Sequence, residues 1–285
     1  MSKIFDDFAE FMKTQPYELT RVSMMKDGEI ETIEFNPANP CQNSYSVAKS
    51  FTMTAIGILY DRGLVKLDEK ICDIFADELP ESGMDERWYD STIEMALRHR
   101  LGLPGGFLDI DCNPSSEFGE DYLRYMFEYP LEYDPGTESR YSDGAFYLLS
   151  CIVEKKSGMK TDDFLWKNLL YKMGFQEFAW SHCPKGHAMG ATGLYLHSSD
   201  MVKLGYLYLN HGVYNGEQLI SEEWAKLAPE KGYAFGWDEQ RPFYAKGGMC
   251  GQKLAVLPEK NCAIAVQSFG GNSQVPVEWF SDYAE

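Results

Sequence analysis

The sequence has no long apolar run, no internal repeat and no excess of basic residues. In its 285 residues, 26 lysines and arginines stand against 44 aspartates and glutamates, which gives a formal net charge of −18. Because nucleic acids and anionic membranes repel an acidic surface, this charge argues against both as partners. No stretch reaches the roughly 18 apolar residues that a membrane-spanning helix needs, so we expect no membrane span.

Cysteine is sparse and scattered. The seven cysteines are odd in number, lie far apart and include no Cys-x-x-Cys pair, a pattern typical of reduced thiols rather than of a disulfide framework. The segment 1–14 alternates apolar and charged residues as an amphipathic helix does. It lacks the continuous apolar core and the small-residue cleavage site of a secretory signal. We therefore expect a cytoplasmic protein, whose oligomeric state the sequence does not indicate.

What the sequence does contain is a serine three residues before a lysine, at the start of an apolar helical run (Ser46–Lys49). Residues three apart share a helix face, so the Lys49 ammonium can reach the Ser46 hydroxyl. The N–H groups at a helix N-terminus can also stabilise developing negative charge. Such an arrangement activates a serine without a histidine partner. The same residues allow a simpler interpretation, in which Ser46 only caps the helix.

Two other segments share the Ser-x-x-Lys spacing, and their context sets them aside. Ser23–Lys26 lies in a strand-like stretch with a strong hairpin-turn signal. Ser157–Lys160 lies at the end of a helical run that Gly158 is expected to terminate. Only Ser46 precedes a helix of useful length, from residue 47 to about residue 62.

The pattern along the chain predicts an antiparallel sheet built from both of its ends. Residues 19–35 and 253–268 are each typical of a hairpin, whereas the stretch between them is mostly helical in pattern and is punctuated by glycine and proline. We therefore expect an α/β fold with a sheet of about five antiparallel strands flanked by helices. The expected organisation is one domain, with an α/β lobe of residues 1–70 and 186–285 and an inserted helical lobe of residues 71–185.

Two further segments can carry chemistry. Tyr141–Asp143 precedes a helical run, and a tyrosine in such a loop can accept a proton when nearby cations lower its pKa from about 10. Lys246–Gly248 precedes a predicted strand, and its glycines permit close backbone approach to a ligand. Taken alone, each segment is better explained by packing, the first as a loop against a helix cap and the second as an ordinary glycine-rich turn.

In this order the three segments resemble the motifs of the serine β-lactamase and penicillin-binding-protein superfamily. The closer resemblance is to its class C-like branch, which includes esterases and D-amino-acid peptidases and has tyrosine in the second motif. The resemblance covers nearly the whole chain. Further matching segments are Thr92–His99, Gly102–Pro104, Gly193–Asp200, Leu207–Ile220, Phe235–Trp237, Gly251-Gln252 and Pro258.

The resemblance implies a role for each matching residue. Ser46 would be the acylated nucleophile, Lys49 its proton partner and Tyr141 the general base or proton relay. The Lys246–Gly248 segment would contact the substrate, and the backbone N–H groups of Ser46 and Met249 would form the oxyanion hole. The implied activity is hydrolysis of a small ester, amide or peptide through an acyl-serine intermediate, with no metal and no organic cofactor.

Two positions in the substrate-binding set depart from the family pattern. Members usually have asparagine where this chain has Asp143, and commonly threonine or serine where it has Gly247. A carboxylate at Asp143 favours a charged Lys49 and passes the role of base to Tyr141. It also repels a carboxylate-bearing β-lactam, and the hydroxyl missing at Gly247 removes another carboxylate contact. We therefore expect a serine hydrolase that is not an efficient penicillinase. The alternative left open is a catalytically silent module that binds a peptide or cell-wall fragment.

Three histidines are further candidates for site residues. His182 and His187, with Cys183 between them, suggest a metal site. No second cluster in the sequence supplies further ligands and the neighbouring proline and glycine indicate a loop, so we expect no zinc there. His99 is expected to be a hydrogen-bonded core or turn residue rather than a general base.

Overall fold

A computed structural model describes residues 2–284, and its contacts divide the chain into two compact units. Unit 1 consists of the chain up to Val47, Leu169–Ala179 and the chain from Leu194 onward, and unit 2 consists of Ala48–Asn168 and Trp180–Gly193. These divisions differ from the lobes expected from the sequence. Residues 48–70 and 186–193, expected in the α/β lobe, belong to unit 2, whereas residues 169–179, expected in the helical lobe, belong to unit 1.

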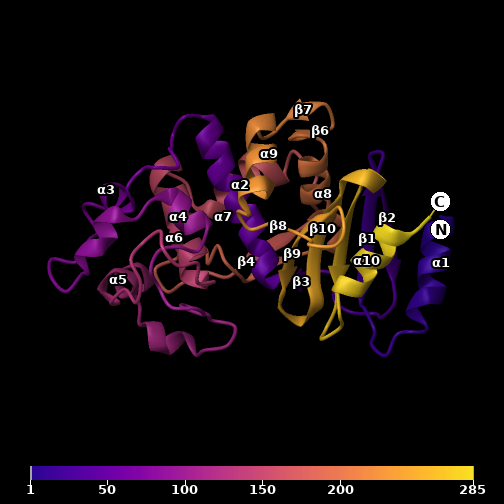
Figure 1. Ribbon diagram of the computed structural model, residues 1–285, viewed down its shortest axis with the longest axis horizontal. Coiled ribbons are helices and arrows are strands. Elements are labelled where there is room, and N and C mark those ends of the chain that lie inside the picture. Colours follow the sequence, from indigo (N-terminus) through magenta and orange to yellow (C-terminus); the bar gives the residue numbers. More distant parts are fainter. Residues whose placement is uncertain (1, 285) are drawn as a thin grey trace. The chain divides into compact units, whose positions relative to one another are not determined.

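Unit 1 is built on an antiparallel sheet with the strand order β2-β1-β11-β10-β9-β8 (Figure 1). The N-terminal hairpin pairs with a strand from the far end of the chain, so that Val22 lies opposite Val266. The prediction of a sheet built from both ends is therefore confirmed, with β8 as a short sixth strand. The strands are β1 (Arg21–Lys26), β2 (Glu29–Glu34), β8 (Gly236–Trp237), β9 (Tyr244–Gly248), β10 (Gln252–Leu257) and β11 (Cys262–Gln267).

Helices cover both faces of this sheet. Helices α1 (Lys3–Met12) and α10 (Gln274–Asp282) pack on one face through a buried cluster that includes Phe8, Phe280 and Ile264. Helix α8 (Ser198–Leu209) packs on the other face, where Gly205 lies against Ala263 and Leu254. Successive side chains of a strand point to opposite faces of the sheet, and helices cover both faces here. The strands β10 and β11 are therefore apolar on both sides.

A second, smaller sheet of unit 1 has the order β3-β5-β4. Its strands are short: β3 (Gln42–Asn43), β5 (Leu194–Leu196) and β4 (Phe178–Trp180). β3 leads directly into the 3-10 turn η1 (Tyr45–Val47), which contains Ser46. The other elements of unit 1 are β6 (Val213–Tyr214), β7 (Glu217–Gln218), α9 (Glu222–Lys231), η5 (Met249–Gly251) and η6 (Pro258–Lys260).

Unit 2 is mainly helical. Its two longest helices are α2 (Ala48–Asp61), whose residues 48–59 are all buried, and α6 (Asp143–Ser157), which ends at Gly158 with φ +70° as predicted. A helix that is buried all round is mostly apolar, as the run after Ser46 is, and its buried polar residues include Lys49 and Thr52, which bond to backbone carbonyls. The others are α3 (Ile71–Ile74), η2 (Glu86–Asp90), α4 (Ile93–Leu97), η3 (Ser115–Phe118), α5 (Tyr122–Glu128), α7 (Thr161–Leu165) and the π-helical η4 (Trp166–Leu170), whose last two residues belong to unit 1.

Two expectations about the whole chain can be compared with residues 2–284. None of the helices described there combines the length and the apolar character needed to cross a bilayer. All seven cysteines lie in this part of the chain as free thiols.

Candidate active site

Ser46 lies in a constrained segment of unit 1. Tyr45, the residue before it, has φ +46°, in the left-handed region that bulky residues seldom adopt. The turn is held by two hydrogen bonds: the Tyr45 N–H donates to Asn43 Oδ1 at 2.9 Å, and the Val47 N–H donates to the Ser44 carbonyl at 3.1 Å. A residue held in an unusual backbone conformation, here Tyr45 next to Ser46 and just before a helix, is typical of a functional position.

Strand β9 lies directly against this segment. A Cβ on Gly248 would stand 2.4 Å from the Ser44 carbonyl oxygen and 3.3 Å from the Ser46 nitrogen, so no side chain larger than hydrogen fits there. Unit 1 therefore brings together Ser46 and the Lys246–Gly248 segment. Met249, the second predicted oxyanion-hole residue, follows Gly248 immediately and begins η5.

Lys49 and Asp143 form a buried ion pair in unit 2. Lys49 Nζ donates to Asp143 Oδ1 at 2.6 Å and to the Ala191 carbonyl at 3.0 Å, and no part of the Lys49 side chain is exposed. The two residues stand in the first turns of α2 and α6. Asp143 is thus at a helix N-terminus, where the helix dipole favours a negative charge.

Tyr141 extends the same group. The Lys49 ammonium lies 4.8 Å from the centroid of the Tyr141 ring, and Tyr141 is 46% exposed. The phenol is thus a partly exposed group beside a buried cation. Unit 2 therefore brings together Lys49, Tyr141 and Asp143.

His99 holds the loop that carries Tyr141. The His99 ring lies 4.5 Å from the Tyr141 ring, centroid to centroid, and His99 Nδ1 accepts the Ser142 N–H at 3.3 Å. The His99 carbonyl accepts the Arg140 N–H at 2.8 Å, and His99 itself has φ +53°. These contacts agree with the expected role of a hydrogen-bonded turn residue.

Two further acids stand beside Asp143. Carboxylate oxygens of Asp109, Asp111 and Asp143 all lie within 4.8 Å of one another. Thr192 Oγ1 donates a hydrogen bond to Asp111. Asp109 and Asp111 were not predicted as site residues. The feature of the sequence that could have indicated them is their position, two aspartates in the loop just after the matching Gly102–Pro104 segment.

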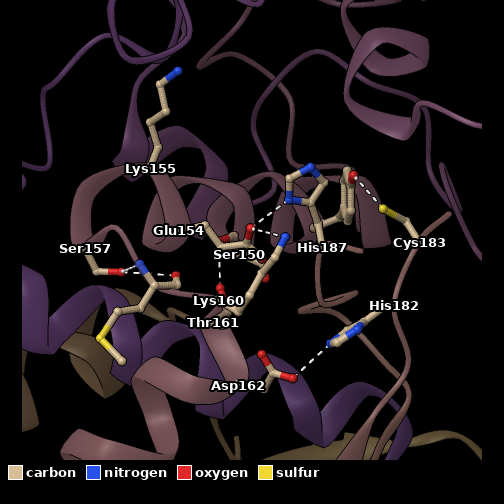
Figure 2. Close-up of polar contacts among 12 residues, drawn as sticks. Ser150, Glu154, Lys155, Ser157, Lys160, Thr161, Asp162, His182, Cys183 and His187 are labelled. Carbon is tan, nitrogen blue, oxygen red and sulfur yellow. Dashed lines mark hydrogen bonds and ion pairs between the residues drawn. The ribbon is translucent and has the colours of Figure 1, made fainter. Parts of the chain in front are cut away.

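The two histidines considered as metal ligands contact different carboxylates. His182 Nε2 lies 2.9 Å from Asp162 Oδ2, whereas His187 Nδ1 lies 2.8 Å from Glu154 Oε2, which also accepts from Lys160 (Figure 2). Figure 2 shows the His187 ring directed to Glu154 and the His182 ring directed to Asp162. Each histidine thus has its own carboxylate partner.

Comparison with known proteins identifies the class to which this fold and these motifs belong. Residues 39–279 match the Beta-lactamase family model, and the chain belongs to that family, whose members are serine hydrolases and penicillin-binding proteins.

Individual relatives are distant. The chain is 24% identical over 194 residues to an N-acetylmuramyl-L-alanine amidase of Bacillus subtilis, covering 50% of this chain and 44% of that protein. It is 27% identical over 137 residues to penicillin-binding protein 4* of the same organism, covering 46% of this chain and 29% of that protein. The chain thus spans less than half the length of these two curated relatives. The penicillin binding protein from Bacillus halodurans has the same fold, with a TM-score of 0.70, 20% identity and coverage of 98% of this chain and 99% of that one.

Proposed function

We propose that the protein is a serine hydrolase that cleaves a small ester or amide through an acyl intermediate on Ser46. The observation that carries the proposal is the buried Lys49 ammonium, paired with Asp143 and placed 4.8 Å from the Tyr141 ring. Burying a charged lysine is costly, and a packing role alone would be filled at less cost by an apolar side chain. Lys49 stands three residues after Ser46 in the chain, which supports a shared site.

In the proposed mechanism Tyr141 is the base. The Tyr141 phenolate takes the proton of the Ser46 hydroxyl while Ser46 Oγ bonds to the substrate carbonyl carbon. The carbonyl oxygen becomes an oxyanion, held by the backbone N–H groups of Ser46 and Met249. When the intermediate collapses, the bond to the leaving group breaks and the proton on Tyr141 passes to that group. Water then attacks the acyl-serine by the same steps in reverse and releases the acid.

The role of Lys49 follows from its partners. Its Nζ donates to both Asp143 and the Ala191 carbonyl, so it is suited to be a stationary cation that stabilises the Tyr141 phenolate. A fixed positive charge in a water-poor site lowers the free energy of the phenolate without reorganising during the reaction.

The charge around Asp143 limits the substrates that we propose. Asp109 and Asp111 add two carboxylates to that of Asp143, and like charges repel an anionic substrate. The substrate is therefore a neutral or cationic acyl donor, and β-lactams, which carry a carboxylate, are hydrolysed inefficiently. The absence of a hydroxyl at Gly247 supports the same limit.

The experiment is covalent labelling followed by intact mass measurement. The full chain is incubated with a fluorophosphonate or a chromogenic short-chain ester. A phosphonyl or acyl adduct that disappears in Ser46→Ala supports the proposal. Ser44→Ala, at a buried serine two residues away, is the matched control and must keep the adduct.

Turnover is then measured on a panel of short-chain esters, D-amino amides and β-lactams. Turnover of esters or amides that depends on Ser46 is the expected result. No adduct and no turnover across the panel would overturn the proposal and favour a module that binds a peptide or cell-wall fragment without cleaving it.

A further inference from the structure

A cysteine, a histidine and a glutamate converge at one end of the small sheet of unit 1. Ligand atoms of Cys41, Glu177 and His197 all lie within 4.8 Å of one another. The three residues come from segments far apart in the sequence, and none of them has a role in the proposed hydrolysis.

The register of the sheet explains why they meet. β3 and β5 are antiparallel, with Gln42 opposite Leu196. Cys41 immediately precedes β3 and His197 immediately follows β5, so the two extend this register by one pair. Glu177 immediately precedes β4, which neighbours β5 in the same sheet.

The side chain of His197 contacts this cluster and does not cap its own helix. His197 is the N-cap residue of α8, yet its side chain makes no capping hydrogen bond there. Its Nε2 lies 3.1 Å from Glu177 Oε1, and only 17% of the side chain is exposed. Glu177 is also a hydrogen-bond partner of the Cys41 thiol.

The carboxylate of Asp200 is a further negative charge close to the cluster, and it already has hydrogen-bond partners outside the cluster. Asp200 contributes to the electrostatic environment of Cys41, but its two carboxylate oxygens pair with Lys203 Nζ at 2.6 Å and with the Gln176 N–H at 2.9 Å. The second of these bonds fixes the residue next to Glu177. Asp200 therefore holds the cluster in place and adds negative charge without being needed as a ligand.

We propose that Cys41, Glu177 and His197 bind a zinc ion that ties together the ends of β3, β4 and β5. Thiolate, imidazole and carboxylate are the three ligand types of protein zinc sites, with metal–ligand distances of about 2.0–2.3 Å. Ligand atoms around such an ion stand roughly 3.3–3.8 Å apart in a tetrahedron, a spacing that small side-chain adjustments reach from the observed cluster. Water fills the fourth position.

The site has a structural role. Cys41 is separated from Ser46 only by β3, Ser44 and Tyr45, the first residue of η1, so an ion at the strand ends would stiffen the segment that positions the nucleophile. The expectation that the reaction needs no metal is unchanged, because the ion would take no part in the chemistry.

The test uses cobalt as a spectroscopic probe and zinc as competitor, with the full chain under reducing conditions. One Co²⁺ per chain should bind and give a thiolate-to-cobalt charge-transfer band that Zn²⁺ removes. Cys41→Ser should abolish the band, and His197→Ala should weaken Co²⁺ binding by at least about tenfold. Cys112→Ser and His182→Ala, at a cysteine and a histidine outside the cluster, are the matched controls and should leave the band unchanged.

A thermal melt supplies the second readout. Zinc should raise the Tm of the wild type, because an ion that binds the folded state stabilises it, and should not raise the Tm of Glu177→Gln. Glu177 is largely exposed (62%), so this variant should fold even if Cys41→Ser does not. The absence of a cobalt–thiolate band in the wild type would overturn the proposal, as would a band that survives Cys41→Ser and Glu177→Gln. Neither result bears on hydrolysis by Ser46.

Discussion

The Lys49 ammonium and the Asp143 carboxylate are joined by a 2.6 Å hydrogen bond beneath the Tyr141 ring, with Lys49 fully buried. Relatives with asparagine at this position would provide an amide donor to the substrate. Here the position instead holds a negative charge, and the charge has a testable effect on substrate choice.

Asp143→Asn should shift selectivity toward acyl donors that carry a carboxylate. Removing a like charge and adding an amide donor is worth about 1–3 kcal/mol, so the kcat/KM ratio of a β-lactam over a neutral ester should rise roughly tenfold to a hundredfold. Neutral ester turnover should change less, because Ser46 and Tyr141 remain. Steady-state kinetics on the two substrates measure the ratio.

Asp109→Asn is the matched control for Asp143→Asn, because it removes one negative charge from the same group of acids and leaves the Lys49–Asp143 ion pair in place. A smaller change in the ratio is expected. An equal loss for both substrates in Asp143→Asn would mean that Asp143 orients the catalytic groups rather than selecting substrate charge.

Gly248→Ala should disrupt the Ser46 segment. The added methyl group would meet the Ser44 carbonyl at 2.4 Å, and overpacking of this kind costs about 1–3 kcal/mol or displaces backbone. Both the Tm and ester turnover should fall. At Gly247, one residue earlier, a Cβ meets no described atom within 4 Å, so Gly247→Ala should stay within about 0.5 kcal/mol of wild type. Equal stability of the two variants would contradict the close packing of β9 on η1.

His99 should act as a positioning residue for Tyr141. His99→Ala removes both the ring contact and the acceptor of the Ser142 N–H. We expect kcat to fall on the order of 10- to 100-fold, with a smaller change in KM, because small displacements of catalytic groups are costly. His99→Asn should restore part of kcat, since asparagine accepts a hydrogen bond and tolerates φ +53°. A His99→Ala enzyme with wild-type kcat would exclude this role.

Asp85 should contribute to stability only while it is charged. Hydrogen bonds from the Arg87 side chain lower the pKa of Asp85 to about 2, from an ordinary value of 3.8. Because its pKa is lower in the folded state, the stabilisation is present above pH about 4 and is lost as the pH falls toward 2. The free energy of unfolding of Asp85→Asn, measured with urea, should therefore lie below that of wild type at neutral pH and converge with it in acid.

Asp134→Asn is the control for Asp85→Asn. Asp134 is the second partner of Arg87, at 2.9 Å, and its side chain is 72% exposed, so its loss should cost less than about 1 kcal/mol. A difference between wild type and Asp85→Asn that stays constant across this pH range would show that the charge of Asp85 is not what matters.

The parts of the fold and site that were predictable from the sequence are those with a local pattern. The Ser46–Lys49 spacing, the hairpin around Asp27-Gly28 and the helix stop at Gly158 are each set by residues a few positions apart. The family was predictable because its three motifs are short segments in a recognisable order. β8, a two-residue strand, has no periodicity to detect.

The features that were missed depend on register between distant segments. His197 meets Cys41 because β3 and β5 pair in one particular alignment, and nothing near either residue in the sequence specifies that alignment. The same holds for Asp109 and Asp111, whose approach to Asp143 is set by where a loop crosses the start of α6. The lobe boundary at residue 70 was placed by pattern, whereas the unit boundary after Val47 follows from contacts of α2 with α6 and α7.

The pairing of β1 with β11 has a consequence for synthesis of the chain. The N-terminal hairpin leaves the ribosome early, yet the partner strand for β1 is complete only when residue 267 has been made. Until then β1 presents an unpaired edge, which is prone to association with other chains. The packing around Ser46 also forms late, because β9, which lies against the turn that contains Ser46, is synthesised late. The whole of unit 2 is translated before the site can close, so folding of unit 1 is necessarily a late event dominated by long-range contacts.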